Sequence, residues 1–163
     1  PPPSATPTAD PDRVATRVRI AALDIDLPVV KGPKGYPYCN VAMYLVSQDL
    51  FQPGQGRATY LFGHARTGMF LPLLETSEKK QIGMVVEVWT SDDFRFLYEI
   101  VDVRRNQTSL DDPLSAESEE LWLQTSEGPR GTVGKTQVVA LPLSVERADP
   151  ADAHPTAKPV DCG

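Results

Sequence analysis

Residues Glu120–Gly128, ELWLQTSEG, have the pattern of a buried strand that runs into a turn. The apolar and aromatic side chains at the start of this stretch are of the kind that strands favour, and Gly128 marks the turn. A small hydroxyl residue, Ser126, stands at the end of the expected strand, where a rigid element would present a nucleophile. We therefore expect a core strand with a candidate site at its carboxyl end.

Outward from this strand, short stretches rich in β-branched and aromatic residues recur with polar turns between them. They are Arg17–Leu23, Leu27–Val30, Ala58–Phe62, Met84–Thr90, Phe94–Arg104 and Thr136–Val145. Helical signal is sparse, and we expect short helices only at Met69–Thr76 and Pro113–Glu120. Seven or eight strands with one or two short helices predict an all-β fold, either a closed barrel or a sandwich.

The longest expected strand shows how its two faces should divide. Alternation places Phe94, Phe96, Tyr98 and Ile100 on one face, and leaves Val103 on the other. We therefore expect the first four of these residues to face the core.

Composition excludes some classes of partner. The chain has 163 residues, the size of one domain, with 16 Lys and Arg against 22 Asp and Glu, for a net charge of −6. It has no basic cluster, so we expect no nucleic-acid partner. The acidic pairs Asp92-Asp93 and Asp111-Asp112 lack EF-hand spacing, and His154 has no ligand companions nearby in sequence. We expect no metal and no cofactor.

Proline-rich ends bracket the regular part of the chain. We predict a linker or stalk over residues 1–13, a single β domain over 14–146 and a proline-rich tail over 147–163. The chain begins with Pro1 and holds no apolar run long enough to span a bilayer. We expect a processed or truncated chain that meets a membrane only through a missing N-terminal anchor; a cytosolic protein with an unstructured N-terminus is the alternative.

Leu61–Arg66, LFGHAR, adds a second signature to the strand that ends at Ser126. A strand ending in Gly-His, followed later by a strand ending in Thr plus a nucleophile, resembles the sortases, the cysteine transpeptidases that attach proteins to Gram-positive cell walls. The order and spacing of the other strands extend the resemblance over roughly residues 14–145. It implies a sortase-like closed β-barrel, located on the extracellular side of a bacterial membrane or in the cell wall.

The resemblance also implies a site. In sortases a cysteine attacks an LPxTG-like sorting signal, a histidine exchanges protons, an arginine steadies the substrate, and an amine from the cell wall or a pilin resolves the acyl-enzyme. The corresponding residues of this chain are Ser126, His64 and Lys135, with Thr125 and Arg130 as candidate substrate-binding residues. Both Ser126 and Lys135 depart from the pattern. A serine hydroxyl needs a base during attack, and lysine lacks the two-pronged donor geometry of arginine.

Several accounts of Ser126 stay open. It is an engineered Cys→Ser change, or a natural serine nucleophile with His64 or Lys135 as base, or part of a sortase-like scaffold that binds a peptide without cleaving it. Taken in isolation, His64 also fits a strand-end histidine bonded to backbone, and Ser126 a turn serine. The resemblance therefore implies a transpeptidase-type protein whose catalysis is impaired or absent.

The chain has two cysteines, and neither occupies the nucleophile position. Cys39 precedes the expected third strand, and Cys162 is close to the end of the tail. An even pair in an exported protein is consistent with one disulfide, which would hold the tail near Tyr36–Asn40; two free thiols are the alternative.

Overall fold

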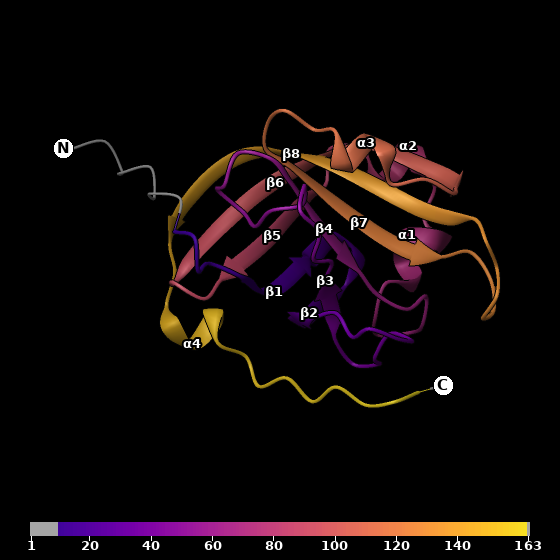
Figure 1. Cartoon of the computed structure of the whole chain (residues 1–163), viewed down its shortest axis with the longest axis horizontal. Helices are drawn as coiled ribbons and strands as arrows, with labels where there is room; N and C mark the ends of the chain where they lie inside the picture. The colour runs from indigo at the N-terminus through magenta and orange to yellow at the C-terminus, as the bar shows by residue number, and fades with distance from the viewer. Residues whose placement is uncertain (1–9, 163) are drawn as a thin grey trace.

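The computed structural model describes residues 10–162, and within them eight strands close into a barrel (Figure 1). Around the barrel the strands follow the order β1-β2-β3-β4-β7-β8-β6-β5. Their bounds are β1 Ala15–Ile20, β2 Ile25–Lys31, β3 Ala42–Tyr44, β4 Ala58–Phe62, β5 Val85–Thr90, β6 Phe94–Gln107, β7 Glu120–Ser126 and β8 Lys135–Arg147. The all-β barrel predicted from the sequence is confirmed.

The helices are short and lie outside the barrel. In the described part of the chain they are η1 Ala21–Leu23, α1 Leu71–Glu75, α2 Glu78–Gln81, α3 Asp111–Leu114 and α4 Pro150–Ala153. The expectation of one or two helices was too low, because α2 and α4 are single turns with too little sequence for an apolar period. The helix expected at Pro113–Glu120 was also misplaced. It ends at Leu114, and Glu120 already begins β7.

Strand β6 corrects the expected division of its faces. Phe96, Tyr98 and Ile100 are buried as expected, but Val103 is buried as well, at 5% exposure. The register against β8 shifts between Ile100 and Asp102, so the strand changes face at this bulge. Strict alternation fails there because an extra residue enters one strand of the pair.

Two neighbouring strands position the candidate site. Strand β4 pairs in parallel with β7, and their register ends with Phe62 opposite Gln124. Since the strands run in the same direction, their carboxyl ends lie at the same rim of the barrel. Strand β7 also pairs with β8, in a register that sets Ser126 opposite Lys135. The chain segments that follow β4 and β7 therefore meet the start of β8 at one rim.

The opposite part of the barrel is secured by a buried charge. Arg13, 1% exposed, donates from Nε and Nη2 to the carboxylate of Asp92, with Nη2–Oδ2 at 2.7 Å, and from Nη1 to the Pro53 carbonyl. Arg13 was assigned to the linker from composition, and in the structure it packs against the barrel. Residues 1–9 of the predicted linker lie outside the described residues.

The C-terminal segment runs along the outside of the barrel (Figure 1) and is tied to it covalently. After α4, Val160 exchanges backbone hydrogen bonds with Cys39, and a disulfide joins Cys39 to Cys162. The predicted pairing of the two cysteines is thus present, and the segment lies beside the loop before β3. In the described residues, no helix is long and apolar enough to cross a membrane.

Candidate functional site

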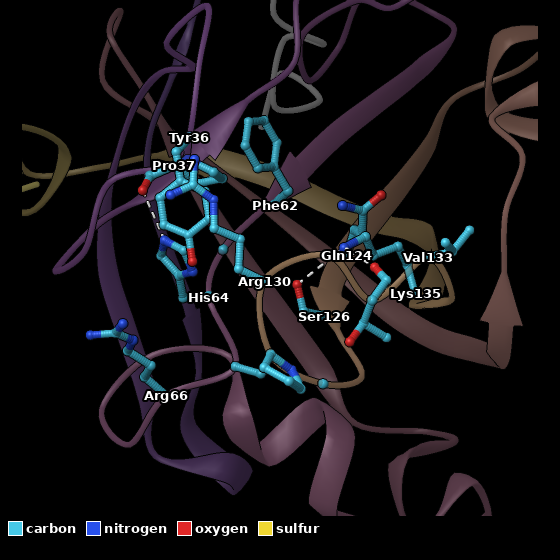
Figure 2. Close-up of a pocket in the computed structure, with 16 residues that line it drawn as sticks. Tyr36, Pro37, Phe62, His64, Arg66, Gln124, Ser126, Arg130, Val133 and Lys135 are labelled. Atoms are coloured by element: carbon cyan, nitrogen blue, oxygen red, sulfur yellow. Dashed lines mark hydrogen bonds between the residues drawn. The ribbon is translucent and has the colours of Figure 1, made fainter. Parts of the chain in front are cut away.

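A cleft of about 800 Å³ opens at the rim where β4, β7 and β8 meet (Figure 2). Residues from three loops and the adjoining strand ends line it, and they include four of the residues singled out from the sequence. The full lining is Tyr36, Pro37, Phe62, Gly63, His64, Ala65, Arg66, Gln124, Ser126, Gly128, Pro129, Arg130, Gly131, Thr132, Val133 and Lys135. His64, Ser126, Arg130 and Lys135 therefore share one cavity.

Ser126 is paired with Lys135. The ammonium Nζ of Lys135 donates to Ser126 Oγ at 3.3 Å and to the carbonyl of Thr132 at 3.2 Å. The cross-strand register explains the contact, since the two residues stand directly opposite each other at the ends of β7 and β8. The hydroxyl is thus an acceptor from a cation, and it has no base bonded to it among the described residues.

His64 stands on the other side of the cleft and bonds elsewhere. Its Nε2 lies 2.8 Å from the Pro37 carbonyl, and because a carbonyl only accepts, Nε2 carries the proton. The ring is 5.0 Å from that of Tyr36, centroid to centroid, and the residue is 8% exposed. Within residues 10–162, no hydrogen bond joins His64 to Ser126. The histidine matches the backbone-bonded alternative raised from the sequence, yet it still faces the cleft.

Arg130 reaches across the cleft from the β7–β8 loop. Its guanidinium lies 4.2 Å from the centroid of the Tyr36 ring, a cation–π contact. Figure 2 shows its side chain between the His64 side of the pocket and Ser126. Arg130 is exposed, and the aromatic ring of Tyr36 holds its guanidinium at the cleft.

Thr125 has a different place from the one assumed for a substrate-binding residue. It is 1% exposed, its hydroxyl donates to the Gly63 carbonyl at 3.0 Å, and it does not line the cleft. The bond ties the end of β7 to the residue before His64. Thr125 therefore joins the two walls of the site from behind.

A carboxylate supports the Lys135 side of the cleft. Glu127 accepts from the Thr136 hydroxyl at 2.7 Å and from the Asn106 backbone N–H at 2.8 Å. Although desolvation opposes it, these bonds and the charges of Arg105 and Lys135 hold the pKa of Glu127 below its ordinary value. At neutral pH Glu127 is thus an anion on the Lys135 side of the cleft.

Sequence reasoning missed the Tyr36–Pro37 wall of the cleft. Tyr36 contacts both His64 and Arg130, and Pro37 orients the imidazole. These residues lie in a loop with no strand or helix pattern, and only their nearness to Cys39 in the sequence hinted at a role. The disulfide brings potential metal ligands together there, since the ligand atoms of Cys39, His64 and Cys162 lie within 4.8 Å of one another.

The architecture matches solved structures of known proteins. Sortase A of Listeria monocytogenes superposes with a TM-score of 0.67 at 15% identity, covering 83% of this chain and 90% of that chain. The chain has the sortase fold. Streptococcus pneumoniae sortase C gives a TM-score of 0.65 at 16% identity over 85% and 72% of the two chains, and Corynebacterium diphtheriae sortase A gives 0.63 at 17% over 86% and 65%.

The sequence itself is far from these sortases. No protein-family model and no curated protein sequence matches the chain. A likeness at this level of identity establishes the barrel and its strand order, while activity has to be argued from the side chains in the cleft.

Proposed function

We propose that the cleft binds an extended peptide of the sorting-signal type and that transpeptidation at Ser126 is weak or absent. The observation that carries this proposal is the contact of Ser126 Oγ with Lys135 Nζ. A serine becomes a nucleophile when a base takes its proton, and an ammonium cannot do so. Both cysteines of the chain are joined in the disulfide, so no thiol substitutes for the hydroxyl.

The position of His64 supports the same conclusion. In serine and cysteine acyl transfer, a histidine must be within hydrogen-bond reach of the nucleophile and must be oriented by a further group. Here the orienting bond is made, to Pro37, but the ring has no bond to Ser126. The site thus has the parts of an acyl-transfer centre without the contact that would activate it.

The lining of the cleft suits a peptide. Phe62 and the 72% exposed Val133 offer apolar surface, whereas Arg130 and Lys135 offer donors to peptide carbonyls. Main-chain groups of the glycine-rich β7–β8 loop also face the cavity at Gly128 and Gly131. We propose the sorting signal of a bacterial surface protein as the ligand, with a cell-wall or pilin amine as acceptor if any transfer occurs.

We also propose that the protein acts on the extracellular side of a bacterial membrane or in the cell wall. The disulfide supports this location, since disulfides persist mainly in oxidising compartments. Labelling of intact cells with a membrane-impermeant reagent would test it, and a chain found only inside the cell would contradict it.

The experiment for the function separates binding from chemistry. A fluorescent LPxTG-type peptide should bind, a scrambled peptide of the same composition should bind at least about tenfold more weakly, and mass spectrometry should find no acyl-enzyme. Ser126→Cys, alone or with Lys135→Arg, should gain a measurable acyl-enzyme and cleavage product. Equal binding of both peptides would contradict peptide recognition, and a Ser126→Cys protein without any acyl-enzyme would contradict the site.

A second candidate function rests on the same 3.3 Å contact between Lys135 Nζ and Ser126 Oγ. If Lys135 loses its proton on binding substrate, it becomes a base for Ser126, and the protein is a serine transpeptidase. This candidate predicts turnover by the unmodified protein that is lost in Ser126→Ala and also in Lys135→Arg, because arginine does not deprotonate. Under the first proposal, Lys135→Arg leaves the chain as inactive as before.

A further inference from the structure

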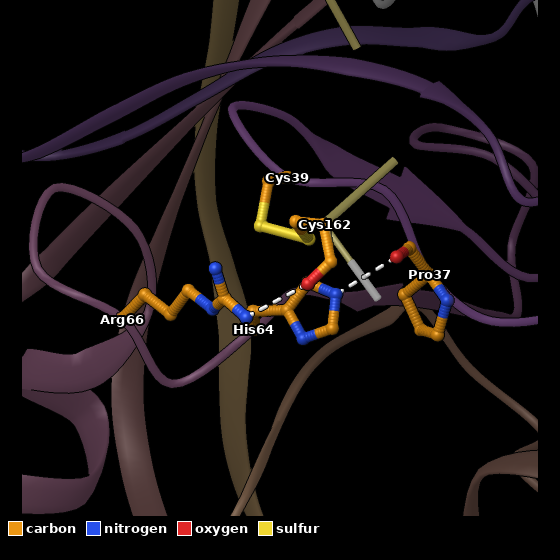
Figure 3. The surroundings of a disulfide bond; sticks show 5 residues. All are labelled: Pro37, Cys39, His64, Arg66 and Cys162. Carbon is orange, nitrogen blue, oxygen red and sulfur yellow. Dashed lines mark hydrogen bonds between the residues drawn. A yellow bond between two sulfur atoms is a disulfide. The ribbon is translucent and has the colours of Figure 1, made fainter. Parts of the chain in front are cut away.

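The disulfide lies against a residue of the cleft. Cys39 comes from the loop before β3, Cys162 from the end of the described chain and His64 from the segment after β4 (Figure 3). One ligand atom of each lies within 4.8 Å of the others, and Cys39 and His64 are buried, at 5% and 8% exposure. Two sulfurs and an imidazole nitrogen of this kind are the ligands that Zn²⁺ favours in proteins.

We propose that reduction of the Cys39–Cys162 disulfide turns this cluster into a zinc site formed by two thiolates and the His64 imidazole. In the reduction, a dithiol gives up two electrons and two protons and becomes a disulfide, and the two Sγ atoms take them up as thiols. Zn²⁺ then replaces the two thiol protons, which go to solvent. The two thiolates balance the charge of the ion, and a fourth tetrahedral position is left for water or another ligand.

The backbone keeps the ligands together when the S–S bond is gone. Cys39 and Val160 exchange backbone hydrogen bonds of 2.9 and 3.3 Å, and Arg66 donates to the Cys162 carbonyl at 3.0 Å. None of these contacts involves sulfur. These contacts bring the reduced thiols close to His64 whenever the tail is docked, so zinc binds the docked form and stabilises it against opening.

The geometry fits a tetrahedral ion with small movements. Zn–S bonds of about 2.3 Å and Zn–N bonds of about 2.0 Å place the ligand atoms roughly 3.5–3.8 Å apart. The ligand atoms now lie up to 4.8 Å apart, so the imidazole nitrogen must move closer to the sulfurs. The two sulfurs must move apart once they are no longer bonded to each other. Cys162 is only half-buried, which leaves room for this adjustment.

The proposed zinc ligands include a residue of the cleft. Because His64 forms one wall of the cleft, zinc would also link the redox state of the cysteines to that wall. Zinc binding does not depend on the proposed peptide function and is measured without any peptide.

The test compares the oxidised and reduced forms of the whole chain. The protein is reduced with a phosphine, which does not compete for zinc as a thiol does, then treated with ZnCl₂ and freed of excess ion by gel filtration. We expect about one zinc per reduced chain and none in the oxidised chain, with Co²⁺ giving the absorption bands of thiolate ligation. Bound zinc should also protect both cysteines from alkylation.

Variants assign the ligands. His64→Ala should weaken zinc binding by the reduced chain at least about tenfold, while His154→Ala, the matched control at the other histidine, should leave it unchanged. Cys162→Ser removes one of the two thiolate ligands, so the thiolate absorption bands of bound Co²⁺ should become weaker or disappear. A reduced chain that retains no zinc overturns the proposal. Equal affinity in reduced His64→Ala also overturns it, provided that the oxidised variant melts as a folded protein, because the site would then be a simple dithiol.

Discussion

At the scale of single residues, charged side chains show what local sequence can and cannot reveal. His64 and Ser126 were found because each ends or follows a strand with a readable pattern. Arg13 was assigned to a linker, since its partner Asp92 stands 79 residues further along the chain. The place of Arg13 depends on the closed barrel, which no local pattern contains. The same holds for the Lys135 partner of Ser126, which the β7–β8 register sets.

The Arg13–Asp92 pair makes stability depend on pH. Desolvation opposes ionisation of Asp92, but hydrogen bonds from Arg13 and Thr90 outweigh it and lower its pKa below 3.8. The native state therefore binds the Asp92 proton less tightly than the unfolded chain does. The pair's stabilising contribution is complete above 3.8 and is lost as the pH falls through the lower, folded pKa.

Asp92→Asn should remove that contribution and leave the Arg13 charge buried. We expect the free energy of unfolding near neutral pH to fall by about 2–4 kcal/mol, somewhat below the range for fully buried pairs because Asp92 is partly exposed. Urea unfolding at several pH values would measure it, and the variant should lose less stability than the parent in acid. Asp93→Asn, at the neighbouring exposed pair with His154, is the control and should cost less than about 1 kcal/mol. Equal effects of the two changes would contradict the assigned role of Arg13.

At the scale of elements, the strands were predictable and the irregularities were not. β-branched and aromatic residues marked the strands, but the bulge in β6 depends on its pairing with β8 at Ile100 and Asp102. The single-turn helices and the loop that carries Tyr36 have no period to detect. The cleft is built mostly from such loops. The residues at its strand ends were therefore predicted, whereas the loop residues Tyr36 and Pro37 were not.

The loop before β4 contains two glycines that can be tested against each other. Gly54 and Gly56 both have positive φ, +81° and +86°, which L side chains rarely adopt. A Cβ at Gly54 would collide with the Arg13 guanidinium and lie 3.0 Å from the Phe96 ring, whereas a Cβ at Gly56 would meet nothing within 4 Å. The two positions therefore share backbone strain and differ in packing.

Gly54→Ala should cost about 2–4 kcal/mol of unfolding free energy and Gly56→Ala about 1 kcal/mol, because only the first adds overpacking to strain. Thermal or urea unfolding of both variants measures the difference. If the two variants lose the same stability, the loop does not pack on the buried arginine as described.

At the scale of the whole molecule, one covalent link spans most of the chain. The disulfide joins residues separated by 123 positions, so its covalent loop contains strands β3 to β8 and leaves out β1 and β2. A loop of that order is expected to contribute about 4–5 kcal/mol through the entropy of the unfolded chain, although measured gains are often smaller. The barrel strands have their own core, so we expect the barrel to fold without the link and to gain stability from it.

Reduction in the presence of a chelator should lower the melting temperature by about 10 °C without abolishing the cooperative transition. Residues 147–163 should then become accessible to protease while the barrel resists it. Cys162→Ser should behave like the reduced parent protein. An unchanged melting temperature would contradict a stabilising role of the disulfide, and loss of the barrel on reduction would contradict a barrel that folds without it. The chelator excludes any effect of zinc.

The strand order has a consequence for synthesis. Among the described strands β8 is the last to be synthesised, and it lies between β7 and β6. Until it arrives, β7 has only β4 beside it and β6 has only β5, so both expose an open edge of unpaired N–H and C=O groups. Closure therefore waits for residues up to Arg147. A chain that has not yet placed β8 is therefore an open sheet with two unpaired edges, which can pair with strands of other chains.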